Sequence, residues 1–156
     1  MQIDFDGKGL ETLLSQLQVA ASEERIQQAN EQIVQEGATR AKAIMQPKIP
    51  VSKDNSKSGR ALKMGGESRP SGHARPNVPI GKTRDNGQCG KAAEVGWQLS
   101  DGSEYFYMKF VNWGTAKQPP RDFVDSTAEQ VEPELQKIGE RQYQKLLDET
   151  LGKAAE

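Results

Sequence analysis

The residues that could carry chemistry are few and stand far apart in this sequence. His73 is the single histidine and Cys89 the single cysteine. A histidine with no cysteine or carboxylate at ligand spacing does not predict a metal site, and one without a paired nucleophile does not predict a catalytic triad. We therefore expect His73 to be an ordinary surface or contact residue and Cys89 to be a small buried side chain.

Two carboxylate pairs, Asp122 with Asp125 and Glu132 with Glu134, have spacings that acid/base catalysis uses. Both pairs fall where a C-terminal helix is predicted to begin, and acidic side chains favour the positive end of the helix dipole. The glycines of "KMGGES" and "PIGK" do not match the spacing of phosphate-binding loops. The sequence therefore predicts no enzymatic activity and no cofactor.

Charge is unevenly distributed along the chain. Residues 1–46 carry four basic and seven acidic side chains, residues 47–86 carry nine and three, and residues 87–156 carry eight and twelve. A basic segment without aromatic residues is suited to phosphate contacts that do not read sequence, and equally to an acidic protein neighbour or to plain solvation. The candidate cations for DNA or an acidic partner are Lys53, Lys57, Arg60, Lys63, Arg69, Arg75, Lys82 and Arg84.

The elements that must position these residues belong to a single small domain. The chain has 156 residues, 34% of them hydrophobic, and a mean hydropathy of -0.79. This fraction of hydrophobic residues is low for a chain that must bury its own core, so we expect part of the chain to become ordered only against a partner. No apolar stretch predicts a membrane span or a signal peptide, so we expect a soluble protein made in the cytoplasm.

Helical periodicity dominates the first third of the chain. After a short strand at residues 2–5, apolar residues recur at helical spacing from Leu10 to Ile44, which predicts one long helix over residues 9–46. Pro47 would end this helix, and Gly37 would allow a bend or a break. Residues 47–86 contain five prolines and predict either a disordered segment or a long extended basic arm or loop.

Aromatic residues mark the next elements. "KAAEVGWQLS" and "EYFYMKFVNWG" predict a hairpin over residues 89–113 that turns at Asp101-Gly102. Both faces of the second strand would be apolar and would need cover. A C-terminal helix is predicted over residues 121–151, with Pro133 either kinking it or marking its first turn. The expected fold class is α+β, a small antiparallel sheet packed by a long N-terminal helix and a C-terminal helix.

A set of motifs repeats the order of a known family. The matching residues are "KFVNWGTAKQPPRDFV" at 109–124, Val95-Gly96-Trp97 in the first hairpin strand, and Pro50, Ser58, Gly59 and Leu62 in the arm. This arrangement resembles the small neck or tail-completion proteins of long-tailed bacteriophages, the family typified by gene product ten of a lambdoid phage. Asn112 and Trp113 stand where that family has an acidic-aromatic pair, and Pro120-Arg121-Asp122-Phe123 is a looser form of its Pro-x-Pro-Phe ending.

The resemblance implies a structural virion protein at the junction of head and tail. It implies a homo-oligomeric ring, sixfold or a multiple of it, with head-closure, tail-terminator or tail-tube proteins as partners and packaged DNA as a possible contact in the lumen. No membrane is involved. The residues expected to contact another copy or a partner are Leu62, Met64, Tyr105, Tyr107, Trp113, Pro119 and Pro120.

Overall fold

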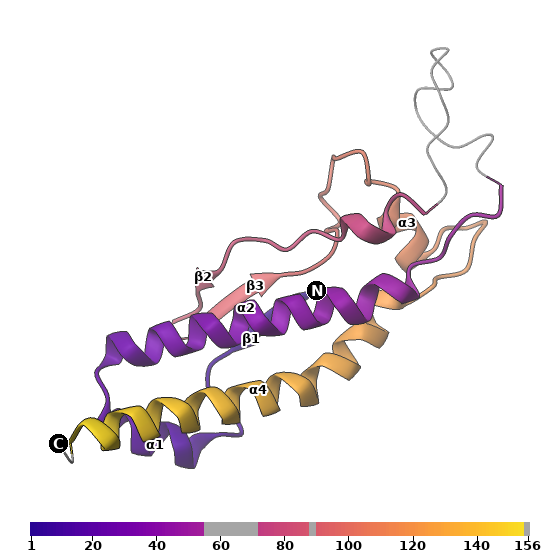
Figure 1. The fold of residues 1–156 in the computed structure, drawn as a ribbon. Coiled ribbons are helices and arrows are strands. Elements are labelled where there is room, and N and C mark those ends of the chain that lie inside the picture. The colour runs from indigo at the N-terminus through magenta and orange to yellow at the C-terminus, as the bar shows by residue number, and fades with distance from the viewer. Residues whose placement is uncertain (55–71, 88–89, 155–156) are drawn as a thin grey trace.

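The fold is α+β, as the sequence predicts, and its layers are visible in a computed structural model that describes residues 1–54, 72–87 and 90–154 (Figure 1). The two long helices, α2 and α4, run beside each other along the length of the molecule. The elements in chain order are β1 (Gln2–Phe5), α1 (Glu11–Ala20), α2 (Glu23–Lys48), η2 (Arg75–Asn77), β2 (Arg84–Asp85), β3 (Lys91–Glu94), α3 (Met108–Trp113) and α4 (Phe123–Ala154).

The sheet has three antiparallel strands in the order β1-β3-β2. Alternation along β1 buries Ile3 and Phe5 on the helix side, where Ile3 pairs with the buried Ala93 of β3. The opposite face carries the polar side chains of Gln2, Asp4, Arg84 and Glu94 around the fully buried Ala92 of β3. On it Arg84 donates hydrogen bonds to Glu94 at 3.0 Å and to Gln2 at 3.1 Å, and no helix covers this face in the described ranges.

The long N-terminal helix is interrupted at a different place from the one we predicted. Residues 9–46 do not form one helix bending at Gly37, because Ala21 is extended and Ser22 begins a new helix by accepting a hydrogen bond from the Arg25 backbone N–H. Gly37 instead lies inside α2, where a Cβ would stand 2.6 Å from Leu135 of α4. Its missing side chain lets the two long helices approach closely.

The aromatic segment is helical, so the predicted hairpin over residues 89–113 is wrong. Its first strand is present as β3, but β3 pairs with β1 and β2, and residues 108–113 form α3. Asp101 accepts hydrogen bonds from both the backbone N–H and the hydroxyl of Ser103, at 2.9 Å each, and the following backbone continues in local turns. These local bonds satisfy the backbone without a strand partner.

The predicted arm over residues 47–86 is too long. Within the described part of that range, α2 continues to Lys48, and Ala74 and Val78 are buried in the core. The Arg75 guanidinium donates to the Ile49 carbonyl oxygen at 2.6 and 3.2 Å, which fixes η2 against the end of α2. Residues 72–86 therefore belong to the folded body, because apolar side chains among the turns find places in the core.

The C-terminal helix agrees with its prediction in type and extent. α4 covers residues 123–154, against the predicted 121–151, and it continues through an exposed Pro133 that does not mark its first turn. At its centre Tyr143 is fully buried, lies edge-on to Phe5 with 5.7 Å between ring centroids, and donates a 2.7 Å hydrogen bond to Asn30 of α2. This buried pair joins the two long helices and the sheet.

Tyr143→Phe is expected to lower the free energy of unfolding by about 1–2 kcal/mol, because it removes the hydroxyl donor from a buried amide oxygen while keeping the ring. Chemical denaturation of the variant and the wild type measures the difference. Unchanged stability of Tyr143→Phe contradicts this role for the pair.

Candidate contact surface

α3 presents two large aromatic side chains to solvent. Met108 and Asn112 of this helix are buried, whereas Phe110 and Trp113 are 46% and 43% exposed. Lys109 joins α3 to the preceding loop, because its ammonium donates to the Leu99 carbonyl oxygen at 2.9 Å and lies 5.5 Å from the centre of the Phe110 ring. Leu99 is 68% exposed. We call Leu99, Phe110 and Trp113 the α3 surface.

Asn112 fixes α3 to the start of α4. Its side-chain oxygen accepts a 3.0 Å hydrogen bond from the Val124 backbone N–H, and its carbonyl oxygen accepts bonds from the backbone N–H groups of Arg121 and Asp122 at 3.1 and 3.2 Å. The side chain thus serves as a remote cap for the first turn of α4. The sequence reasoning missed this role, although a polar residue between apolar neighbours at 111 and 113 was a signal for it.

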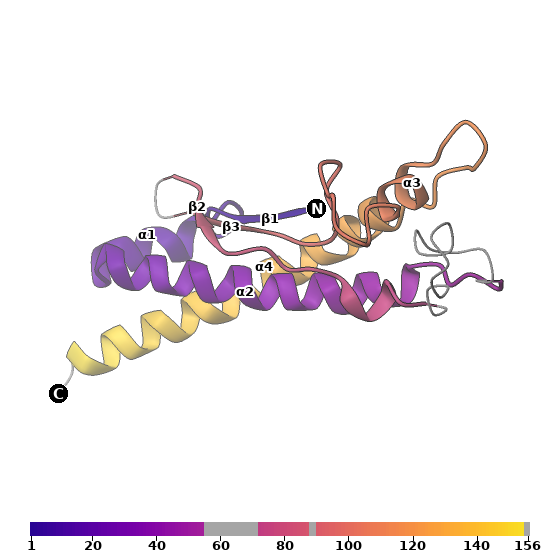
Figure 2. The same cartoon turned by 90° about the horizontal axis from the view of Figure 1, so that it is seen from above.

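The connection between α3 and α4 is a tight turn that projects from the end of the molecule (Figure 2). It reverses direction at Gly114, whose φ of 77° and ψ of 179° define a region open almost exclusively to glycine. Thr115 and Gln118 then pair through two backbone hydrogen bonds of 2.8 and 3.2 Å. Pro119 and Pro120, both predicted contact residues, follow this turn and are exposed.

The predicted contact residues Tyr105 and Tyr107 lie around the histidine. The His73 ring stacks on Tyr105 and on Tyr107 with centroid separations of 5.2 and 5.6 Å, and the Tyr107 hydroxyl lies 3.1 Å from the ring nitrogens. The centroids of the Trp97 and Tyr105 rings are 5.9 Å apart. These half-buried rings hold residues 72–78 against the loop before α3. His73 is therefore a contact residue within the fold, in line with its prediction.

A groove of about 470 Å³ opens beside this aromatic cluster. One wall is formed by residues 77–81 and the other by the loop at 100–105, with residues 94–98 between them. Trp97 and Tyr105 line it, together with the carboxylates of Glu94 and Asp101. The indole Nε1–H of Trp97 is buried and has no acceptor in the described ranges. We call this concavity the Trp97 groove.

The predicted basic residues do not form one patch in the described part of the chain. Lys53 and Lys82 are exposed, whereas Arg75 is bonded to the Ile49 carbonyl oxygen and Arg84 to Glu94 and Gln2. The other basic candidates, Lys57, Arg60, Lys63 and Arg69, lie outside the described residues. The predicted contact residues Leu62 and Met64 lie outside them too, as does Cys89.

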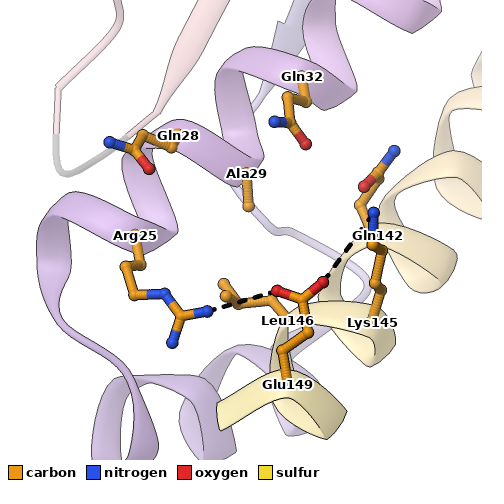
Figure 3. A pocket seen from close by; sticks show the side chains of 8 residues that line it. All are labelled: Arg25, Gln28, Ala29, Gln32, Gln142, Lys145, Leu146 and Glu149. Atoms are coloured by element: carbon orange, nitrogen blue, oxygen red, sulfur yellow. Dashed lines mark hydrogen bonds and ion pairs between the residues drawn. The ribbon is translucent and has the colours of Figure 1, made fainter.

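A second concavity lies between α2 and α4 (Figure 3). Glu149 points into it between Arg25 and Lys145, at 3.4 and 4.0 Å, and three glutamines surround this network. The Arg25 guanidinium also donates to the Thr150 hydroxyl at 2.9 Å. Its charges are satisfied within the chain, so we interpret this concavity as a polar seam between helices.

The two carboxylate pairs singled out in the sequence lie at the start of α4 or within its first turns. Asp122 and Asp125 are exposed at the start of α4, and Glu134 is paired with Arg40 at 3.0 Å. The geometry brings no three metal-ligating side chains together in the ranges described. At the end of α2, Lys48 donates to the carbonyl and hydroxyl oxygens of Ser126, and desolvation lowers the pKa of its ammonium despite the charge of Glu129.

Among the described residues, none of the helices is long and apolar enough to span a bilayer. Comparison of the chain with protein-family models, with curated proteins and with solved structures finds no match.

Proposed function

We propose that this chain is a structural virion protein of a long-tailed phage, which forms a homo-oligomeric ring at the neck and joins head to tail or completes the tail. The proposal rests on the motif order given above and on one structural observation, the exposed aromatic pair of α3. Phe110 and Trp113 stand one helical turn apart on the same side of a helix whose other side is buried.

Burial in an assembly would stabilise such a surface. Each large apolar side chain that leaves water contributes about 1.5–3 kcal/mol, and aromatic rings lose little rotamer entropy when they are fixed. The α3 surface stands on a support held from two sides, by Asn112 at α4 and by Lys109 at the 99–100 loop. A preorganised surface of this kind binds with a smaller entropic cost than a loose loop. The function needs no catalysis and no cofactor.

The other candidate is a nucleic-acid-binding module that uses the basic segment. The exposed cations Lys53 and Lys82 favour it, whereas the intramolecular bonds of Arg75 and Arg84 count against it. Phosphate binding would appear as an affinity that falls steeply with salt. In the neck proposal such contacts would occur in the lumen of the ring and would not read sequence.

The test is the mass of the purified full chain as a function of concentration, with electron microscopy of the largest species. A closed ring of fixed copy number that joins isolated phage heads or tails supports the proposal. A chain that stays monomeric up to millimolar concentration and binds no virion component contradicts it. Salt-dependent binding of duplex DNA by that monomer would support the nucleic-acid module instead.

Trp113→Ala is expected to weaken self-association at least tenfold while the melting temperature stays within about 2 °C of the wild type. The reason is that the Trp113 indole is already exposed in the single chain and contributes little to its core. Analytical ultracentrifugation and thermal melting provide the two readings. The matched control is Val19→Ala, which removes a 92% exposed side chain from α1 and should change neither. An equal effect of both substitutions contradicts the assignment of α3.

A further inference from the structure

The Trp97 groove has features of a binding site that its own chain leaves incomplete. Trp97 is 5% exposed, and its Nε1–H has no acceptor in the described part of the chain. A buried donor without a partner costs about 1–3 kcal/mol, and a carbonyl oxygen reaches this one only if the groove opens around the indole on binding. The groove is mainly apolar at Pro79, Ile80, Trp97 and Tyr105.

One wall of the groove is a free strand edge. Ile80 pairs with Val95 through flanking bonds, from Gly81 N–H to the Glu94 carbonyl at 2.7 Å and from Gly96 N–H to the Pro79 carbonyl at 2.9 Å. In this pairing the backbone N–H and C=O of Ile80 point away from β3. Neither group makes a hydrogen bond within the described ranges. This free edge lies on the side of residues 79–81 that faces away from residues 94–96, so a segment bound over Trp97 would use the apolar lining of the groove, with the edge beside it.

The edge is protected elsewhere. Ile80 lies opposite Val95 and Arg84 opposite Ala92, so three residues face two between these pairs and form a bulge at 81–83. Pro79, Lys82 and Arg84 further discourage a long added strand. The edge is therefore not an open template for a long strand, and the apolar groove beside it is of the aromatic-lined kind that binds short extended proline-rich segments.

We infer that the Trp97 groove binds the exposed Pro119-Pro120 segment of a second copy of this chain, so that the site is completed by the partner. This inference rests on the proposed ring. The segment "KQPPR" at 117–121 is exposed at every residue. It projects from the end of the molecule after α3 (Figure 2). Its prolines are stiff, and Pro119 supplies a carbonyl oxygen next to them, whereas the Gln118 carbonyl already accepts from the Thr115 backbone N–H.

Charge complementarity selects this occupant. The prolines are flanked by Lys117 and Arg121, both exposed, while the charged residues lining the groove are Glu94 and Asp101. Glu94 already pairs with Arg84, but Asp101 has no ion pair in the described residues and accepts from Ser103 alone. The carboxylate of Asp101 is thus opposite in sign to the cations beside the prolines, which favours this partner. Because groove and segment lie at different places on the chain, the contact is heterologous and can close a ring.

The first experiment measures peptide binding to the full chain. The probe is a fluorescently labelled peptide of residues 115–123, "TAKQPPRDF", and the control peptide carries alanine at both proline positions. We expect saturable binding of the proline peptide, with about tenfold weaker binding of the alanine peptide. Trp97→Phe keeps the aromatic ring but loses the donor, and Asp101→Asn loses the charge but keeps an acceptor for Ser103; each should weaken binding about fivefold to tenfold.

The controls keep the inference falsifiable. Leu151→Ala changes an exposed side chain on the last turns of α4, and it should leave peptide affinity unchanged. Melting curves show whether Trp97→Phe is folded; if it is not, Asp101→Asn and the alanine peptide carry the decision. No binding of the proline peptide, or equal binding of both peptides, overturns the inference.

A second experiment separates this inference from the proposed function. The double substitution Pro119→Ala and Pro120→Ala in the full chain should lower self-association at least tenfold without lowering the melting temperature by more than about 3 °C. Rings that form normally from this variant overturn the groove contact and leave the neck protein standing. Peptide binding by a wild-type chain that never assembles supports recognition at the groove and overturns the ring.

Discussion

Gly139→Ala is expected to lower the melting temperature by roughly 5–10 °C, which corresponds to about 2 kcal/mol or more for a domain of this size. A Cβ at Gly139 would stand 2.6–2.8 Å from the Phe5 ring and 2.8 Å from Leu10. Both side chains are buried, so neither can swing into solvent. Overpacking of this kind costs more than the 0.5–1 kcal/mol that alanine gains over glycine in a helix.

Gly152 provides a matched control in the same helix. Nothing lies within 4 Å of the place where its Cβ would be, so Gly152→Ala should be neutral or stabilise by up to about 1 kcal/mol. Phe5→Leu combined with Gly139→Ala should cost less than the sum of the single substitutions, because the smaller side chain makes room for the new methyl group. If Gly139→Ala has the same melting temperature as the wild type, the close approach of α4 to β1 is wrong.

Gly114→Val is expected to lower the free energy of unfolding by about 3 kcal/mol or more. The backbone at Gly114 lies in a region that β-branched residues do not tolerate, which costs of order 1–3 kcal/mol. The new Cβ would also lie 2.7 Å from the Pro120 nitrogen and 2.8 Å from the Gln118 carbonyl oxygen. These are backbone atoms, so a rotamer change cannot relieve the contact. Denaturant titration measures the loss.

The same titration on Gly102→Val supplies the control for Gly114. No atom lies within 4 Å of a Cβ at Gly102, so this substitution in a neighbouring loop should stay within about 0.5 kcal/mol of the wild type. Together with Trp113→Ala, the pair separates folding from assembly at adjacent residues. A Gly114→Val variant that is as stable as the wild type but fails to associate would show that the turn is not required for folding.

The parts of the fold that depend on local periodicity could be predicted from the sequence. Residues 2–5 form β1, and the helical spacing after Phe123 forms α4, because in both cases one side of the element must be buried. The end of the N-terminal helical region near Pro47 is also confirmed, with α2 ending at Lys48. The pattern could not locate the break at Ser22, since both helices share the same apolar period and the break depends on a capping serine.

The aromatic segment shows where periodicity fails. Alternating large residues from Tyr105 to Trp113 fit a strand, but the same residues serve a turn and a short helix that buries Met108 and Asn112. The deciding bonds come from Asp101 and Ser103, and β3 pairs with β1, about ninety residues earlier in the chain, and with the short β2 just before it. For the candidate site, Trp113, Pro119 and Pro120 were identified from sequence, whereas the groove was not, because three separate segments build it.

The pairing of Gln2 with Glu94 has a consequence for synthesis on the ribosome. β1 leaves the exit tunnel first, yet its neighbour β3 follows roughly ninety residues later, a delay of several seconds or more at about 5–20 residues per second. During that delay Ile3 and Phe5 have no sheet to join, and helices α1 and α2 precede the strand and helix that cover them. The nascent chain therefore exposes apolar surface until its second half emerges, which makes it a natural client for ribosome-associated chaperones.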